Sequence, residues 1–169
     1  MSDTPHLEER PERRYLAVAA TTSMDDEPGT IARGLGVLRA RLAERGLAAA
    51  GPPFVRYLEI DMPATLRIEV CAPVGPGVDG DDAVQAGTVP AGCYAVLRHG
   101  GPPEELVEAN ARLQRWAELR GLAFDVRRQG AVSIWGARLE TPIRDPGQPQ
   151  DAQPRETESA YPLPGGSAL

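Results

Sequence analysis

The segment ARLETPIRDPGQ, residues 137–148, places a carboxylate where the pattern favours an apolar residue or a turn former. Glu140 ends a run of strand-forming residues and precedes a proline-rich stretch. A carboxylate on the floor of an apolar, aromatic cleft is poorly hydrated and therefore costly when the cleft is empty. It becomes favourable when a lipophilic cation enters and pairs with it. Placed in such a cleft, Glu140 would recognise a cation by its charge.

The same glutamate also fits a plain structural role. Glu140 could lie in solvent at the end of a strand and form an ion pair with Arg138 or Arg144. Structural ion pairs also perturb carboxylates, so the residues alone favour neither interpretation.

Aromatic residues of the predicted elements are the other candidates for lining such a cleft. Tyr57 lies in a predicted strand, where it could face the cleft or flank a turn. Trp116 lies on the apolar stripe of a predicted helix, where packing in the core is the simpler interpretation. Trp135 and Glu140 fall on opposite strand faces under strict alternation, so both line one cleft only if Gly136 marks a bulge or bend.

The remaining polar candidates predict no metal site and no cofactor. His99 has no second histidine near it in the sequence, because the other histidine, His6, lies in the N-terminal segment. It is therefore a weak metal ligand and a weak base candidate. Glu69 and Glu158 occupy corresponding positions of two similar sequence segments, which favours a shared structural role. The GLG motif at residues 34–36 lies in a predicted helix, where close helix packing is favoured over a phosphate-binding loop.

Composition and charge favour one globular domain in a reducing, cytoplasmic environment. The chain has 169 residues, 41% of them hydrophobic, and carries a formal net charge of −6. An acidic chain without an evident basic face, and with little sequence before its first predicted strand, is not expected to bind nucleic acid directly. It contains no apolar run of about twenty residues and no secretory signal, so no membrane association is expected. Cys71 and Cys93 are predicted to be inert core thiols.

The elements that position these residues occur twice in the same order. A strand at residues 14–24, a helix from Thr30 to Gly46 and strands at 54–60 and 65–74 form the first set. A strand at 91–100, a helix ending at Gly121 and strands at 131–140 and 156–163 form the second. The order predicts an α+β fold made of duplicated βαββ half-domains that complete one core.

The expected domain covers residues 13–163. One half spans about 13–74, a linker spans 75–88, and the other half spans about 89–163. Residues 1–12 and 164–169 are expected to be flexible ends.

Three segments in this order resemble one known family. They are VPAGCYAVLRHGGPPEEL at 89–106, LETPIRDP at 139–146 and ESAYPL at 158–163. They are similar to the GyrI-like small-molecule-binding domain, which is also the effector-binding domain of AraC-type and MerR-type regulators. The resemblance covers roughly residues 12–163.

The resemblance implies a fold and a site. The expected fold has pseudo-twofold symmetry, antiparallel sheets, two long helices and a central cleft lined by aromatic residues and one acid, at the position of Glu140. The implied ligand-binding residues are Glu140, Trp116, Tyr57, Trp135 and Tyr161. The sequence departs from the family's pattern at Pro103 and Pro142, where the family usually carries tyrosines.

Two functions follow from the resemblance. The first is a stand-alone module that captures lipophilic, cationic or polycyclic aromatic compounds and acts as a sensor or in drug sequestration and resistance. The second is a hydrolase that opens strained electrophilic rings of natural products with Glu140. Binding comes first, because the sequence carries no separate nucleophile motif, metal set or nucleotide loop. The expected partner is a small molecule, and a homodimer is left open.

Overall fold

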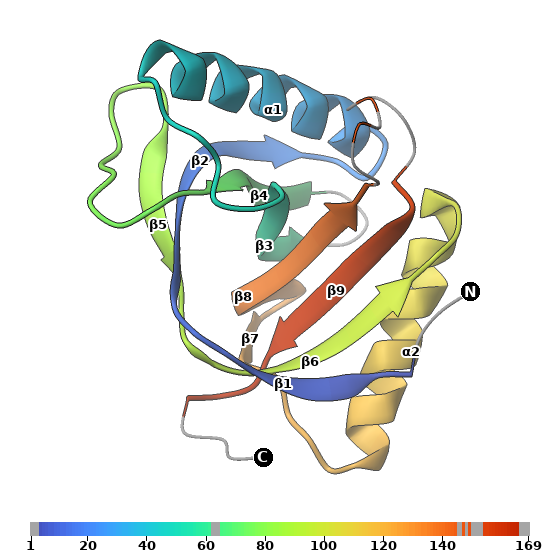
Figure 1. Cartoon of the computed structure of the whole chain (residues 1–169). Coiled ribbons are helices and arrows are strands. Elements are labelled where there is room, and N and C mark those ends of the chain that lie inside the picture. Colours follow the sequence, from blue (N-terminus) through green and yellow to red (C-terminus); the bar gives the residue numbers. More distant parts are fainter. Residues whose placement is uncertain (1–3, 62–64, 145–146, 148, 150–153, 166–169) are drawn as a thin grey trace.

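One curled antiparallel sheet forms the frame of the protein in its computed structural model (Figure 1), which describes residues 4–61, 65–144, 147, 149 and 154–165. The strands among these residues are β1 (His6–Arg10), β2 (Arg13–Thr22), β3 (Phe54–Asp61), β4 (Thr65–Pro73), β5 (Gln85–Val89), β6 (Gly92–His99), β7 (Val126–Gln129), β8 (Val132–Ile143) and β9 (Glu156–Pro162). Their order across the sheet is β1-β6-β9-β8-β3-β4-β2-β5, and β7 pairs with β8. The helices are α1 (Glu27–Glu44) and α2 (Leu106–Leu119), and α2 follows a short 3-10 turn at Pro103–Glu105.

The duplication predicted from the sequence is visible in the strand order. The β2-α1-β3-β4 unit and the β6-α2-β8-β9 unit have the same order of elements, apart from the 3-10 turn before α2 and the additional strand β7 before β8. Their strands lie in the order β6-β9-β8 followed by β3-β4-β2. Counted outward from the central antiparallel β3-β8 pair, corresponding strands of the two halves therefore occupy the same positions. The structure confirms the α+β fold with two equivalent halves, and the centre of the sheet is the point where they meet.

The first strand of each half is exchanged between the halves. β1 leads into β2 but pairs with β6 of the other half, whereas β5 leads into β6 but pairs with β2. The expectation of a flexible segment before residue 13 is therefore wrong for His6–Arg10. The HLEER sequence gives little hydrophobic signal, and its strand is held by backbone pairing and by ion pairs of Arg10 with Glu8 and Glu158.

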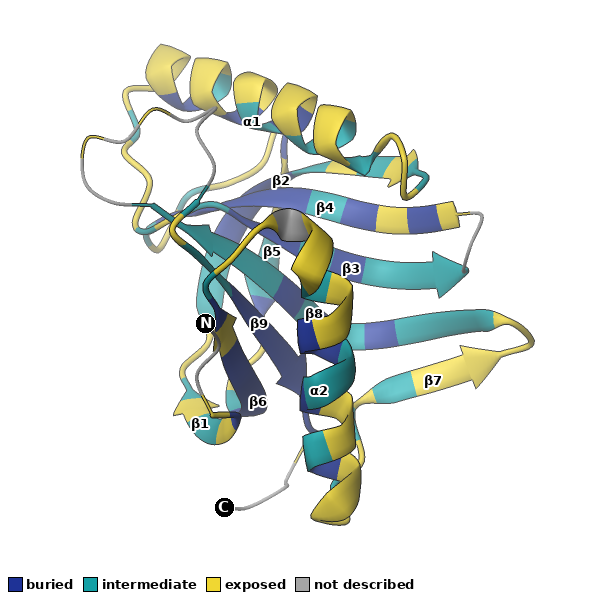
Figure 2. Ribbon diagram, turned by 90° about the vertical axis from the view of Figure 1, so that its right-hand side faces the viewer, coloured by how far each residue is buried: buried dark blue, intermediate teal, exposed yellow. Residues whose placement is uncertain are grey.

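Each helix covers the strands of its own half through a narrow stripe of small and apolar residues (Figure 2). On α1, Leu38 and Leu42 are buried, and a Cβ atom at Gly34 would lie 2.8 Å from Cγ2 of Val70. This close approach confirms the packing interpretation for Gly34 of the GLG motif, whereas Gly36 faces open space. On α2, the stripe contains Ala109, Leu113 and Ala117. Both helices end before a glycine with positive φ, Gly46 at 63° and Gly121 at 67°, as their sequences predict.

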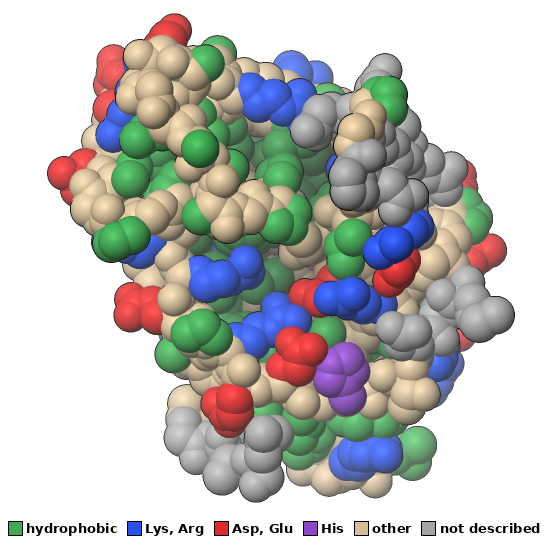
Figure 3. Space-filling model, viewed as in Figure 1, with side chains coloured by type: hydrophobic (Ala, Val, Ile, Leu, Met, Phe, Trp, Pro, Cys, Tyr) green, Lys and Arg blue, Asp and Glu red, His purple; other side chains and the backbone are tan. Residues whose placement is uncertain are grey.

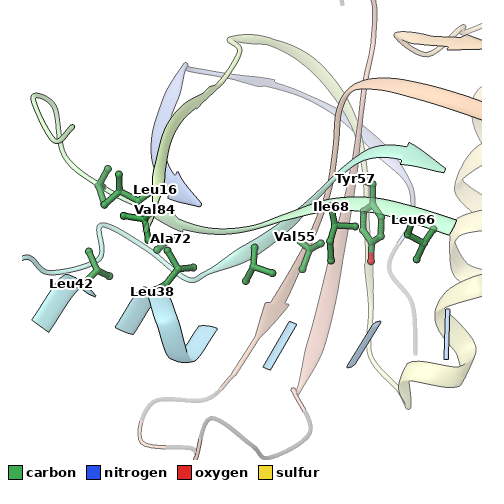
Figure 4. Packing of buried hydrophobic residues seen from close by; sticks show 11 residues of the cluster. Leu16, Leu38, Leu42, Val55, Tyr57, Leu66, Ile68, Ala72 and Val84 are labelled. Carbon is green, nitrogen blue, oxygen red and sulfur yellow. The ribbon is translucent and has the colours of Figure 1, made fainter. Parts of the chain in front are cut away.

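The helix side of the sheet carries two hydrophobic clusters. The first lies under α1 and contains Leu38, Leu42, Leu66, Ile68 and, at one end, Tyr57 (Figure 4). The second lies under α2 and is built around Leu113, Trp135 and Tyr161. A third cluster, which contains the free thiol Cys71 and the aromatic residues Tyr15 and Phe54, covers the opposite face. The β3-β8 pair therefore lies at the junction of the two helix-covered clusters.

A bulge in β8 changes which residues face the helices. Tyr57 pairs with Arg138, but Glu59 pairs with Ile134, so β8 carries additional residues between these two pairs. As a result Trp135 joins the cluster under α2, whereas Ala137 packs on the opposite face. The sequence identified Gly136 as the residue needed for this irregularity. Its backbone nitrogen donates to the carbonyl oxygen of Asp125 at 2.9 Å, and a Cβ atom there would clash with the Asp125 carboxylate.

Strand β8 is longer than the sequence predicts, which corrects the expectation that Glu140 ends it. The strand continues to Ile143, and Pro142 pairs with Thr157 of β9. Pairing with β3 stops at Val55 opposite Glu140, so β8 beyond this point has a partner on one side only. A proline is tolerated there because no second neighbour needs its missing N–H group.

Candidate functional site

Glu140 lies within the central strand pair and faces the helices. It is opposite Val55 of β3 and Ser159 of β9, and its side chain is partly buried. Tyr57, two residues further along β3, faces the same side. The local alternation of both strands thus directs these polar groups into the junction between α1 and α2.

Both carboxylate oxygens of Glu140 accept hydrogen bonds. The Tyr57 hydroxyl donates to Oε2 at 3.2 Å, and Nδ2 of Asn110 on α2 donates to Oε1 at 3.1 Å. The Asn110 carbonyl in turn accepts a hydrogen bond of 2.6 Å from the Ser159 hydroxyl. The partners of Glu140 are therefore a phenol and an amide, rather than the arginines that a surface ion pair would use.

A second carboxylate, Glu27 in the first turn of α1, approaches the same phenol. The Tyr57 hydroxyl donates to Oε1 of Glu27 as well as to Glu140. A phenol carries one hydrogen, so it satisfies only one of the two acids at a time. Burial, with a further contribution from the negative charge of Glu140, raises the pKa of Glu27 above its ordinary value. Burial and the two nearby carboxylates raise the pKa of Tyr57 well above its ordinary value.

Three aromatic rings surround the guanidinium of Arg138. Its Cζ atom lies 4.5 Å from the ring centroid of Tyr161, 4.9 Å from that of Trp135 and 5.7 Å from that of Tyr57. The rings belong to three neighbouring strands and are almost completely buried, with exposed fractions of 0% for Tyr161, 8% for Trp135 and 6% for Tyr57. Burial raises the pKa of Tyr161 to about 12, so its hydroxyl remains neutral at physiological pH. This group of three rings is called the aromatic cage below.

Two further aromatic residues extend the cage. Phe124 lies 5.2 Å from Tyr161 and 5.9 Å from Trp135 between ring centroids. Trp116 packs against the same cluster from α2, and Cζ of Arg120 lies 4.3 Å from its ring centroid. The indole nitrogens of Trp116 and Trp135 are buried and have no hydrogen-bond partner among the described residues.

The structure thus brings all five residues predicted from the sequence into one region. Sequence reasoning missed Glu27, Asn110, Ser159 and Phe124, and it considered Arg138 only as an ion-pair partner. The acid in the first turn of α1 resembles an ordinary helix-start residue, and Asn110 lies beside the buried stripe of α2. Their sequence context carries no signal that separates them from residues of ordinary helix ends and faces.

Two cavities of the protein are lined by residues other than the five predicted from the sequence. A cavity of about 600 Å³ is lined by residues that include Arg13, Arg14 and Pro73, and one of about 410 Å³ is lined by residues that include Gln114 and Phe124. None of the five predicted site residues lines either cavity. The smaller cavity borders the aromatic cage through Phe124.

The other candidates from the sequence have structural partners. His99 is buried, and its Nε2 atom lies 3.2 Å from Oε2 of Glu105. Tyr15 donates a hydrogen bond to Glu69 at 2.7 Å, and Arg10 lies 2.8 Å from Glu158. Among the described residues, no group of three metal-ligating side chains is present. No helix in the described part of the chain is both long and apolar enough to cross a membrane.

Comparison with known proteins gives a family and a set of similar folds. The sequence model of the GyrI-like small-molecule-binding domain matches residues 3–132. The crystal structure of the EcmrR C-terminal domain has a TM-score of 0.74 and 18% identity, covering 95% of this chain and 96% of that chain. This chain spans 57% of the longer EcmrR chain in an EcmrR–DNA complex. No curated protein matches the sequence significantly.

Two other solved structures have a similar fold. SAV2435, solved with bound tetraphenylphosphonium, has a TM-score of 0.62 and 12% identity, with 96% of this chain and 95% of that chain covered. A hydrolase from Listeria innocua has a TM-score of 0.62 and 18% identity, with 94% and 91% covered. At these identities the likeness shows a shared fold.

Proposed function

Because the chain belongs to the GyrI-like small-molecule-binding domain family, we propose that it captures lipophilic organic cations and polycyclic aromatic compounds at the site around Glu140. The observation that carries this proposal is the juxtaposition of a partly buried carboxylate with the aromatic cage. Glu140 accepts hydrogen bonds from Asn110 and from Tyr57, which is itself a ring of the cage. The other two rings, Trp135 and Tyr161, contact each other and lie around the same Arg138 guanidinium as Tyr57. Such a site offers both charge and apolar area to a ligand.

The charges of the site favour a cation over an anion. Glu27 and Glu140 share the Tyr57 hydroxyl, and Arg138 is the basic residue that contacts the cage. When both acids are ionised, the local formal charge is negative. A cation that enters relieves the repulsion between the acids, which contributes, after burial, to the raised pKa of Glu27. The tetraphenylphosphonium bound by SAV2435 is an ion of this class, and it supports the proposal through the shared fold.

We further propose that the protein acts as a sensor or by sequestering its ligand, without direct contact to nucleic acid. The formal net charge is −6. On the face drawn in Figure 3, acidic and arginine side chains lie next to one another rather than forming a basic stripe. DNA binding relies on clustered basic residues that neutralise phosphates. A gel shift with duplex DNA at physiological ionic strength tests this part, and a salt-sensitive shift contradicts it.

A hydrolase is the second candidate, and the pair of acids around Tyr57 favours it. Glu140 would take a proton from water while the water oxygen bonds to a strained-ring carbon and a ring bond breaks. Protonated Glu27 would supply a proton to the leaving atom, because its pKa is raised. Incubation with a strained electrophile followed by mass analysis separates the candidates. A product that is heavier by one water supports the hydrolase, and an unchanged compound supports the binder.

The test of the binding proposal is calorimetric titration of tetraphenylphosphonium into the parent protein and the Glu140→Gln variant. Loss of a partly desolvated charge pair of about 1–3 kcal/mol predicts a roughly ten- to hundredfold weaker affinity. Neutral triphenylphosphine oxide should bind both proteins alike. Glu104→Gln, which removes an exposed acid near α2, is the matched control and should bind as the parent does. Equal affinities of parent and Glu140→Gln for the cation contradict the proposal.

A further inference from the structure

The aromatic cage already holds a cation that belongs to the chain itself. The Arg138 guanidinium lies within 4.5–5.7 Å of the ring centroids of Tyr161, Trp135 and Tyr57. These distances fall in the range in which a cation is attracted to the face of an aromatic ring. Pairing of Arg138 with Tyr57, together with the bulge that turns Trp135 toward the helices, puts the guanidinium between the rings. An organic cation would seek the same position.

The hydrogen bonds that the structure shows to the carboxylates of the site come from residues other than Arg138. The hydrogen bonds to Glu140 come from Tyr57 and Asn110, and Glu27 accepts from Tyr57. Nε of Arg138 is buried and has no hydrogen-bond partner among the described residues. The guanidinium also interacts with the Tyr161 hydroxyl. A buried donor without a partner is unfavourable, and a contact to a neutral hydroxyl is weaker than a bidentate ion pair with a carboxylate.

Arg138 is also the part of the cage that can move. The three rings belong to packed clusters of the core, whereas Arg138 is only partly buried and has a long flexible stem. Neither the cavity of about 600 Å³ nor that of about 410 Å³ is lined by a ring of the cage. Because Arg138 is partly buried and flexible, movement of its guanidinium toward solvent would open space for a ligand against these rings.

We propose that Arg138 is an internal competitor for cationic ligands, whose guanidinium has to leave the aromatic cage before a ligand cation can enter. This inference rests on the proposed binding function and names the residue that sets its charge selectivity. A small cation gains little more from the rings than Arg138 gives up, so it binds weakly. A cation with a large aromatic surface adds buried area and displaces the guanidinium. Arg138 also partly offsets the charges of Glu27 and Glu140, which makes anions less strongly excluded.

The test uses two ions of the same shape and opposite charge, tetraphenylphosphonium and tetraphenylborate. Calorimetric titrations compare the parent with Arg138→Met and Arg138→Gln. Removal of the resident cation should strengthen binding of tetraphenylphosphonium about tenfold and weaken binding of tetraphenylborate about tenfold, in line with cation–π and charge effects of this size. Arg127→Gln removes an exposed arginine of β7 and should leave both affinities unchanged.

The outcomes separate this inference from the proposed function. If Glu140→Gln weakens cation binding but both Arg138 variants bind tetraphenylphosphonium no more tightly than the parent, the role of Arg138 is overturned and the function stands. If the parent and the Arg138 variants all fail to bind either ion, both are overturned.

A measurement on the parent protein does not depend on how the variants fold. The buried Nε–H of Arg138 should give a resonance that is protected from solvent exchange in the free protein and loses that protection when tetraphenylphosphonium is added. Protection that persists at saturation contradicts the displacement of Arg138.

Discussion

Asn110 on α2 donates a hydrogen bond from Nδ2 to Oε1 of Glu140 on β8 at 3.1 Å. Its carbonyl accepts from Ser159 at 2.6 Å, so this buried amide joins the helix to two strands. The position of the Glu140 carboxylate therefore depends on helix α2, through the uncharged side chain of Asn110.

Asn110→Leu should destabilise the protein by about 1–3 kcal/mol, because Glu140 and Ser159 each lose a buried hydrogen-bond partner. Urea unfolding monitored by tryptophan fluorescence measures the change. Val107→Ala, on the exposed side of the same helix, should change stability by no more than about 0.5 kcal/mol. An Asn110→Leu variant as stable as this control contradicts the bridging role.

The raised pKa of Glu27 predicts a pH-dependent stability. In the folded protein Glu27 keeps its proton to a higher pH than in the unfolded chain, where the ordinary value is 4.5. Between these two pKa values the folded state binds more protons, so its stability falls as the pH rises through this window. Glu27→Gln removes this effect. The parent should therefore lose stability relative to the variant as the pH is raised from about 4 to 7 in urea unfolding experiments. A stability difference that does not change with pH contradicts the shifted pKa.

The sequence predicted the fold well because its signals are local and occur twice. Apolar spacing identified both helices, and Gly46 and Gly121 marked their ends. It failed for the exchanged strand β1, because HLEER contains one apolar residue and its pairing with β6 joins segments far apart in the chain. Long-range backbone pairing of a polar edge strand leaves no periodic pattern to read.

The aromatic residues and Glu140 that the structure brings together could be singled out from the sequence, because a carboxylate that follows a run of strand-forming residues is uncommon. Prediction failed for Glu27 and Asn110, because an acid at a helix start and an amide on a helix face are common. The role of Arg138 was missed for another reason. Sequence spacing suggested that Arg138 and Glu140 could pair, whereas the bulge at Gly136 puts the rings within reach of the guanidinium.

Gly136→Ala should disturb both stability and the site. A Cβ atom at this position would lie 2.7 Å from Cγ of Asp125 and closer still to a carboxylate oxygen, so either the Asp125 side chain or the bulge has to shift. We expect a loss of stability of about 1–3 kcal/mol and a changed tryptophan emission spectrum, because Trp135 moves relative to Tyr161. Gly36→Ala, on an open face of α1, should be neutral or stabilising by up to about 1 kcal/mol. A Gly136→Ala protein with the parent's stability and spectrum contradicts this account of the bulge.

The exchange of β1 and β5 predicts that neither half folds alone. A chain divided within residues 75–84 separates β2 from its β5 partner and β6 from its β1 partner. Fragments expressed separately should show no cooperative thermal transition, and an equimolar mixture should recover one. Circular dichroism melts measure this. A single fragment that melts cooperatively near the temperature of the whole chain contradicts the mutual dependence of the halves.

A crystal structure of the protein with tetraphenylphosphonium tests the central claim most directly, because it locates the ligand's charge relative to Glu140. The account predicts that the phosphonium lies at the β3-β8 junction, with its phenyl rings against Trp135 and Tyr161 and the Arg138 guanidinium turned away from the cage. A ligand bound instead in the cavity of about 600 Å³ beside Arg13 and Arg14, with Arg138 still between the rings, would contradict it.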